Sequence, residues 1–290
     1  MTAIVFDNFS YAYDGRRKAL DGIGLTIPAG SCTAVAGPGG AGKTTLCLAV
    51  CGVVPHYFGG SMAGKVTVAG VDTVRSSMGE LSAHVGTVLE DYESQLVTMT
   101  VAEEIAFALE NRGLDHVSIS RRIDEVLDQV GLTGLAGREV GSLSGGQKQR
   151  LAIASVLATR PGLLVLDEPA SALDPEGAEE LYALLARLNR EHGMTLVVVE
   201  HDLARVLAYA EQLVVLDNGR VACQGAPGEV LPLLARREEL AALVPPLWRM
   251  KLGLEEVLDT AFAAWRHEDE AVGELGEFIR ACRREETKSA

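Results

Sequence analysis

A glycine-rich loop followed by lysine and threonine is the part of this sequence whose residue types and spacing bear most directly on chemistry. It reads Gly37-Pro38-Gly39-Gly40-Ala41-Gly42-Lys43-Thr44 and fits the pattern G-x-x-x-x-G-K-[ST]. The pattern requires glycines because the backbone must turn tightly to direct several N–H groups at one anion, and a Cβ atom would block its approach. In such a loop, Lys43 reaches the β- and γ-phosphates of a nucleotide and the Thr44 hydroxyl binds Mg²⁺. The loop therefore predicts nucleotide binding.

The segments on either side of the loop have the composition of the elements that would hold it. Residues 33–36 before it form a short apolar run that is typical of a strand, and residues 46–54 after it are apolar and compatible with a helix. A helix that begins at the loop adds the positive end of its dipole to the anion site. This order of strand, loop and helix argues against a glycine-rich turn that matches the pattern by chance.

Composition and charge reduce the number of possible function classes further. The 290 residues are 48% hydrophobic, which is enough for one large domain with an appendage or for two domains. The formal net charge of −14 argues against a nucleic-acid-binding protein, which needs clustered Lys and Arg side chains to displace counterions. The N-terminal MTAIVFDNF lacks the basic and long apolar segments of a signal peptide, and the longest apolar runs are far shorter than a membrane span. We therefore expect the chain to remain in the cytosol.

The cysteines are expected to be reduced thiols, because five is an odd number and no secretion signal precedes them. Cys47 and Cys51 lie one helical turn apart just after the glycine loop. They would suit a metal or redox pair only if further ligands converged on them, and we interpret both as small buried hydrophobic side chains.

Periodicity assigns the elements before and after this loop. Alternating apolar residues predict β-structure over residues 4–27, a hairpin over 65–70 and a strand over 85–89. Thr100 and Glu103 have the spacing of a capping box that begins a helix, and a second helix is predicted to stop at Gly131. The middle of the chain is therefore predicted to be helical.

A second glycine-containing motif precedes a predicted helix over residues 148–159. It reads Ser144-Gly145-Gly146-Gln147, and its backbone N–H groups and the helix dipole could hold an anion. Alone the motif is a weak signal, since Ser-Gly is also an ordinary helix cap.

Two predicted buried strands end in side chains that could act on a phosphate. Residues 163–166 lead into Asp167 and Glu168, and residues 195–199 lead into Glu200 and His201. Carboxyl ends of neighbouring parallel strands meet at one edge of a sheet, where ligands bind. One carboxylate can then hold Mg²⁺ through water while the other orients or deprotonates an attacking water. The alternatives are solvated acids and a structural histidine.

The motifs GPGGAGKT, LSGGQ, LLVLDEP, SALD and VVVEHD, in this order and at these intervals, resemble those of the ATP-binding cassette (ABC) ATPases. The resemblance covers about residues 4–234, and LSGGQ together with the phosphate loop is highly specific. It implies an α/β fold: a P-loop NTPase (RecA-like) core with an N-terminal antiparallel β-subdomain and an inserted α-helical subdomain. It further implies ATP and Mg²⁺ as cofactors. Two such chains would pair head to tail, with the loop of one and the LSGGQ of the other closing on the same ATP.

The resemblance also implies the residues that contact the nucleotide. Those of the chain's own site are Gly37, Gly39, Gly40, Ala41, Gly42, Lys43, Thr44 and Thr45. Those that serve the opposite subunit's nucleotide are Ser144, Gly145, Gly146 and Gln147. Of the two nearby tyrosines, Tyr13 matches the adenine-stacking aromatic better than Tyr11.

For hydrolysis, the resemblance implies that Asp167 and Thr44 serve the metal, Glu168 polarises the water and His201 contacts the γ-phosphate. Asp174 would lie at the seam between subunits.

Three longer stretches narrow the resemblance to the ATPase subunits of energy-coupling-factor (ECF) importers of vitamins and metal ions. They are VVPHYFGGSMAGKVTVAG, SQLVTMTVAEEIAFALENRGL and LVVVEHDLARVLAYAEQLVVLDNG. The partners implied are a second ABC ATPase subunit, identical or paralogous, a transmembrane coupling protein in the groove beside the middle helical region, and a substrate-binding membrane subunit. The chain would then lie peripherally on the cytoplasmic face of the cell membrane.

One residue departs from the family pattern. Glu90 stands where the usual V-G-x-V-F-Q-D-P-E-x-Q-L has glutamine, and Tyr92 stands where it has proline. A glutamine amide offers an oxygen to Mg²⁺ and an N–H₂ donor to water, whereas an ionised glutamate only accepts. We hypothesise that Glu90 still reaches the metal but alters γ-phosphate sensing and slows hydrolysis. The alternative is a tolerated substitution.

The C-terminal segment after residue 241 leaves the general ABC pattern. Pro245-Pro246 is expected to break the chain. Two apolar stripes then predict two amphipathic helices, one through Leu254, Val257, Leu258, Ala261 and Trp265, the other through Leu275, Phe278, Ile279 and Cys282. ECF ATPases are similar in carrying a C-terminal helical extension that joins the two subunits; independent solvated helices are the alternative.

The sequence thus predicts an ABC ATP-binding domain over residues 1–240, with its helical subdomain at approximately 90–160, and a dimerising extension over 241–290. Its expected function is to bind and hydrolyse ATP and so to power the uptake of a small solute, a vitamin, its precursor or a metal ion, through membrane partners. The alternatives are a nucleotide-dependent regulatory or degenerate ABC module with slow turnover, and a soluble non-transport ABC ATPase.

Overall fold

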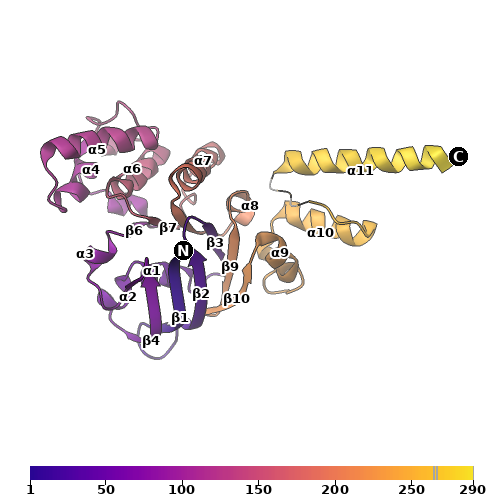
Figure 1. Cartoon of the computed structure of the whole chain (residues 1–290), viewed down its shortest axis with the longest axis horizontal. Helices are drawn as coiled ribbons and strands as arrows, with labels where there is room; N and C mark the ends of the chain where they lie inside the picture. Colours follow the sequence, from indigo (N-terminus) through magenta and orange to yellow (C-terminus); the bar gives the residue numbers. More distant parts are fainter. Residues whose placement is uncertain (264, 266, 290) are drawn as a thin grey trace.

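The chain folds into two β-sheets, a group of helices inserted between strands, and a helical C-terminal segment (Figure 1). A computed structural model describes residues 1–263, 265 and 267–289, and side chains as far as residue 281. Helices α4 to α6 and helices α10 and α11 lie at opposite ends of the long axis, with the sheets between them (Figure 1). Within the part described, no helix is long and apolar enough to cross a membrane.

The first sheet is antiparallel, as predicted for the N-terminal region. Its strands are β1 (Thr2–Ala12), β2 (Leu20–Pro28), β4 (Ser61–Val68) and β5 (Val71–Asp72), in the order β2-β1-β4-β5. Ile4, Phe6 and Tyr11 are buried on the inner face of β1. Strand β4 begins four residues earlier than the predicted Lys65, because residues 61–63 pair with the end of β1.

The second sheet is mostly parallel and forms the centre of the molecule. Its strands are β3 (Cys32–Ala36), β6 (Val85–Val88), β7 (Leu163–Asp167), β8 (Thr195–Val199), β9 (Gln212–Asp217) and β10 (Arg220–Gly225), in the order β10-β9-β3-β8-β7-β6. Only the β9–β10 pair is antiparallel. Every residue of β3, β7 and β8 is buried, as expected for parallel strands covered on both faces. The predicted α/β fold is confirmed.

Two cores lie on the two faces of this sheet. Alternate residues such as Val35, Val165 and Val197 pack with the first sheet and with α1 (Lys43–Val50). The intervening residues such as Ala34, Leu164 and Val198 pack with α6 (Gly145–Ala158), α7 (Pro175–His192), α8 (Leu203–Val206) and α9 (Pro227–Ala235). The short α2 (Val53–His56) and α3 (Met78–Leu81) complete the segment between α1 and β6.

The predicted middle helices are present. They are α4 (Val101–Glu110), α5 (His116–Gln129) and α6, with the 3₁₀ turns η1 (Tyr92–Gln95) and η2 (Val140–Ser142). Thr100 and Glu103 form the expected capping box at the start of α4. Helix α6 begins at Gly145, three residues earlier than predicted.

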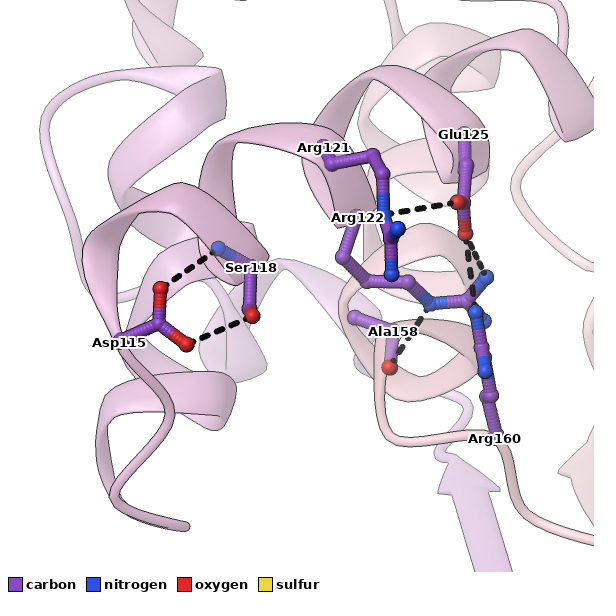
Figure 2. Close-up of polar contacts among 7 residues, drawn as sticks. All are labelled: Asp115, Ser118, Arg121, Arg122, Glu125, Ala158 and Arg160. Carbon is purple, nitrogen blue, oxygen red and sulfur yellow. Dashed lines mark hydrogen bonds and ion pairs between the residues drawn. The ribbon is translucent and has the colours of Figure 1, made fainter.

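The C-terminal end of α6 is held by arginine. Figure 2 shows Arg122 of α5 donating to the carbonyl of Ala158 at 3.0 Å, while Glu125 accepts from Arg122 at 3.0 Å and from Arg160 at 3.1 Å. A cation at the last carbonyls of a helix satisfies acceptors that the helix itself leaves open. The arginine contacts therefore stabilise the C-terminal end of α6, whose N-terminal end carries Ser144.

The C-terminal helices do not coincide with the two apolar stripes that predicted them. The expected break at Pro245-Pro246 is present: Val244 and Pro245 are extended, and Pro246 is the first residue of α10 (Pro246–Leu258), a position that proline favours. Helix α10 ends at Leu258 because Asp259 adopts a left-handed conformation with φ of 48°, so Ala261 and Trp265 lie beyond it.

Trp265 is buried with Phe262 and Ala271 in a small cluster that Leu275 and Phe278 of α11 (Glu268–Ser289) also contact. Val257 is 81% exposed and Ile279 is 51% exposed, so neither belongs to this core. The side chain of Cys282, which completed the second predicted stripe, lies outside the described residues.

Candidate active site

The glycine loop joins β3 to α1, and its glycines are sterically required. Gly42 has φ of 102°, and a Cβ atom there would lie 2.5 Å from the carbonyl oxygen of Ala19. No atom lies within 4 Å of a Cβ built on Gly39 or Gly40, so that side of the loop faces open space. Helix α1 begins at Lys43, directly at the loop as predicted, and no side chain caps its N-terminus. Its first N–H groups and the loop therefore form a cradle that fits a phosphate.

Lys43 is buried inside this loop. Its Nζ donates to the carbonyl oxygens of Gly37 at 2.9 Å and Pro38 at 3.3 Å. The ammonium group thus lies on the concave side of the loop, where it can exchange these neutral acceptors for phosphate oxygens.

Thr44 and Asp167 meet where a metal ion would bind. The Thr44 hydroxyl hydrogen-bonds to the Asp167 carboxylate, which is 3% exposed. Burial raises the pKa of Asp167, and the Thr44 hydrogen bond lowers it. Its Oδ1 is buried and has no hydrogen-bond partner. A buried carboxylate oxygen without a partner is costly, and a hydroxyl beside a carboxylate is a donor set that suits Mg²⁺, so these residues fit the ion.

Glu90 lies two residues after β6, close to Asp167, the last residue of β7, and to Glu168, which follows it. It is exposed, and its charge raises the pKa of Asp167 and also that of Glu168. The structure therefore places Glu90 near the predicted metal ligands.

Glu168 and His201 are in direct contact. The distance between His201 Nε2 and Glu168 Oε1 is 2.8 Å; the Glu168 side chain is 17% exposed and that of His201 is 55% exposed. Burial raises the pKa of Glu168, and His201 lowers it. Glu168 has φ of 50°, a left-handed conformation that few residues other than glycine adopt. The adjacent ends of β7 and β8 thus bring a carboxylate and an imidazole together, as predicted.

Tyr11 of β1 and Tyr13, which directly follows β1, have rings in contact but differ in exposure; their ring centroids are 4.9 Å apart. Tyr11 is 1% exposed and donates its hydroxyl proton to the Gly59 carbonyl at 2.8 Å. Tyr13 is 42% exposed, and its hydroxyl oxygen lies 3.2 Å from Oγ1 of Thr45, next to the glycine loop. Only the Tyr13 ring of this pair is accessible to a purine.

Ser144, Gly145 and Gly146 lie apart from this cradle. Ser144 caps α6, and its capping box with Gln147 satisfies both partners. The motif lines a cavity of about 470 Å³ together with Asp174, and no residue of the glycine loop lines it. Within one chain, the two anion-binding motifs therefore do not line this cavity together.

A larger cavity of about 790 Å³ lies between the central sheet and the inserted helices. Residues from α1, α3, β6, α4 and α6 line it. Four apolar residues of its lining are exposed by 42–81%: Tyr57, Phe58, Met78 and Phe107. Cys51 also lines it, and both Cys47 and Cys51 are buried as predicted; burial raises the pKa of Cys51 to about 12.

Sequence reasoning assigned no role to Glu200, which directly precedes His201. Its side chain is buried and accepts a hydrogen bond from the Tyr182 hydroxyl of α7. The available signal was an acidic residue directly after four consecutive apolar residues of β8, since such a residue needs partners if it is buried.

The chain is similar in sequence to a described protein family and to named relatives. Residues 20–171 match the family model described as ABC transporter. A protein from Pyrococcus abyssi named as an ABC transporter ATP-binding protein is 43% identical over 257 residues, which are 88% of this chain and 91% of that protein. A longer relative from Streptomyces coelicolor with the same kind of name is 46% identical over 79% of this chain, which spans 41% of its length.

Solved structures are similar over most of the chain. The structure of cbiO1 from Clostridium perfringens, described as part of the ABC transporter complex cbiONQ, has a TM-score of 0.72 at 31% identity, covering 83% of this chain and 97% of that one. A dimeric ATP-binding cassette bound to ADP and phosphate has a TM-score of 0.65 at 29% identity, covering 77% of this chain and 98% of that one.

Proposed function

Because this chain belongs to the ABC transporter family of ATP-binding proteins, we propose that it is the ATPase subunit of an importer that takes up a small solute through membrane partners of the ECF type. It binds ATP with Mg²⁺ and hydrolyses it as a transporter subunit. The solute proposed is a vitamin, its precursor or a metal ion, and the proposed location is the cytoplasmic face of the membrane. The similarity to cbiO1 over 97% of that chain is the observation that carries this proposal.

The groove between sheet and inserted helices supports a membrane partner. Its lining exposes Tyr57, Phe58 and Phe107, which an apolar helix of a transmembrane coupling protein would bury. We test this by purifying the tagged chain from native membranes and identifying the attached proteins. Recovery of a multi-span coupling protein and a small membrane subunit is expected. Recovery of the chain alone from the soluble fraction, with full ATPase activity, would favour a soluble ABC ATPase.

The proposed roles of the site residues follow from their geometry. The glycine loop and Lys43 bind the phosphates, and Tyr13 stacks on the purine. Thr44 and Asp167 hold Mg²⁺, which neutralises phosphate charge. Glu168 orients the water and accepts its proton, and His201 donates a hydrogen bond to the γ-phosphate.

The opposite subunit completes the site. Ser144, Gly145, Gly146 and Gln147 of one chain close on the nucleotide of the other, which agrees with their separation from the glycine loop within one chain. The partner is a second copy or a paralogue, and Asp174 lies at the seam between them.

Glu90→Gln is expected to raise the rate of ATP hydrolysis. The charge of Glu90 raises the pKa of Asp167 and Glu168, so its removal leaves one anion fewer beside the phosphates. The amide also restores a donor for water. We expect an increase of about three- to tenfold in kcat, equivalent to about 0.7–1.4 kcal/mol.

Steady-state phosphate release measures the effect of Glu90→Gln, with Glu93→Gln as the matched control, since Glu93 pairs with Lys148 at the surface. Unchanged turnover in Glu90→Gln would support a tolerated substitution. Very slow turnover in both the wild type and Glu90→Gln would favour the regulatory or degenerate module.

The extension over residues 241–290 is proposed to join two subunits. Val272, which is 70% exposed, and Ile279 lie seven residues apart on α11 and so share one face. The double variant Val272→Asp, Ile279→Asp is expected to weaken dimerisation by about tenfold or more, because each carboxylate would have to be desolvated at the interface.

Light scattering with ATP present measures dimerisation of this double variant. Val117→Asp is the matched control, since Val117 is 81% exposed and belongs to α5, a helix at the opposite end of the molecule from α11 (Figure 1). A dimer constant equal to that of the wild type would contradict a role of this face in dimerisation.

A further inference from the structure

Glu200 is a buried acidic residue, 7% exposed, at the point where β8 leaves the central sheet. Its N–H donates to the carbonyl of Val35 in β3 at 3.1 Å, so its backbone still belongs to the sheet edge. Side chains alternate along a strand, which puts Glu200 on the face of Val198, the face that α7 covers. The carboxylate accepts hydrogen bonds from the Tyr182 hydroxyl and from the backbone N–H groups of Ala170 and His201.

We propose that Glu200 is a positioning residue whose carboxylate links the loop after Glu168 to the loop that carries His201. This link keeps the Glu168 and His201 side chains in the same relative position during ATP hydrolysis. The proposal rests on the roles assigned above to Glu168 and His201. It adds a residue that acts through them and does not touch the nucleotide.

The sheet itself cannot hold the two loops together beyond its edge. Strands β7 and β8 pair as far as Asp167 and Val199, and the Glu168 N–H donates to the Val199 carbonyl at 3.0 Å. Ala170, two residues beyond Glu168, donates its N–H to Glu200 instead. The Glu200 carboxylate therefore provides the next link between the loops after the ladder ends.

Helices α7 and α6 each contact one of the two linked loops. Tyr182, which is 3% exposed, reaches Glu200 from α7. From α6, the side-chain amide of Gln149 donates to the carbonyl of Pro169, which precedes Ala170. The helix that begins at Ser144 thus contacts the same loop that Glu200 holds.

The energetics favour a specific role over passive burial. Burial raises the pKa of Glu200, the nearby Glu168 charge raises it further, and the three hydrogen bonds lower it. A buried carboxylate is costly unless its acceptors are used, and here removal would leave two backbone N–H groups and a phenol without their acceptor. Loss of the carboxylate should therefore loosen both loops at once.

Amide hydrogen exchange of the nucleotide-free full chain tests the link without reference to activity. In Glu200→Ala, peptides spanning residues 168–174 and 200–204 are expected to exchange about tenfold faster than in the wild type, with the rest of the sheet unchanged. Glu200→Gln keeps an acceptor oxygen and should be intermediate. Wild-type exchange of both peptides in Glu200→Ala would overturn the proposal.

The rate of hydrolysis tests the consequence. Glu200→Ala is expected to lower kcat by about 10- to 100-fold, with the Kd of a fluorescent ATP analogue within about twofold, because misplacement affects chemistry more than binding. Tyr182→Phe, which removes only one of the three donors, should lower kcat by less and covers the case in which Glu200→Ala does not fold. Glu191→Gln, an exposed residue of α7, is the control with wild-type rate.

The outcomes separate the link from the assigned roles. Wild-type kcat in both Glu200→Ala and Tyr182→Phe, together with a collapse in Glu168→Gln, would overturn the positioning role of Glu200 in hydrolysis and keep the active-site assignment. Wild-type kcat in Glu168→Gln would reject the assignment, and faster exchange of both loops in Glu200→Ala would still confirm the link itself.

Discussion

Glu168→Gln is expected to lower the rate of ATP hydrolysis by about 10²- to 10⁴-fold while ATP still binds, which is the usual contribution of a general base. The glutamine side chain has the shape of glutamate, and its oxygen can still accept from His201, which lies 2.8 Å from the present carboxylate. It cannot accept a proton from water. Phosphate release measures turnover, and a fluorescent ATP analogue measures affinity, which should stay within a few-fold of the wild type.

Glu168→Gln is also expected to increase the amount of dimer formed with ATP. ATP that is bound but not hydrolysed should hold the subunits together, so the dimer should accumulate with ATP and persist after dilution, as light scattering would show. Glu239→Gln, an exposed acid, is the matched control. A Glu168→Gln protein that turns over at the wild-type rate would show that another residue accepts the proton.

The parts of the fold that sequence predicted best are those whose causes are local. The glycine loop is required by the tight approach of Ala19 to Gly42, which only a residue without a side chain permits. The strands β7 and β8 each contain four consecutive apolar residues, a pattern that indicates a strand buried on both faces. Thr100 and Glu103 close a capping box within four residues of sequence.

The C-terminal helices show where periodicity misleads. The apolar spacing continues from Leu254 to Trp265 in sequence, but Asp259 ends α10 and turns the chain back. The Trp265 indole N–H then donates to Glu274 of α11 at 2.6 Å, and its ring packs on Phe262. A residue that is buried by a later helix has the same sequence pattern as one on a continuing helix face, so only the tertiary contact distinguishes them.

The motif residues of the site could be predicted from the sequence, but the residues that hold them in position could not. Glu168 and His201 follow strands whose parallel pairing could be inferred, and the structure brings them into contact. Glu200 follows the same strand as His201, but its main partner Tyr182 is on α7 and is set by how that helix packs. Tyr11 is buried within β1, whereas Tyr13 directly follows the last residue of β1 and is 42% exposed. The difference therefore depends on where the strand ends, which residue alternation does not determine.

Lys43→Ala is expected to remove most of the affinity for ATP. Truncating one partner of a buried, hydrogen-bonded charge pair costs about 2–5 kcal/mol, which corresponds to a loss of about 30-fold to several thousand-fold in affinity. Lys43 meets the condition because it is buried and its Nζ already points at the inside of the loop, 2.9 Å from the Gly37 carbonyl. Equilibrium binding of a fluorescent ATP analogue with Mg²⁺ measures the loss.

The thermal midpoint of unfolding distinguishes lost binding from a damaged loop. A ligand that binds only the folded state stabilises it according to its concentration relative to Kd, so saturating ATP should raise the midpoint of the wild type but not that of Lys43→Ala. Without ATP the two midpoints should be close, because the alanine variant loses only two hydrogen bonds to loop carbonyls that can bond to water instead. Lys65→Ala is the matched control, since its ion pair with Asp72 is at the surface and should affect neither measurement. A Lys43→Ala protein that ATP stabilises as much as the wild type would show that the loop binds phosphate through its backbone alone.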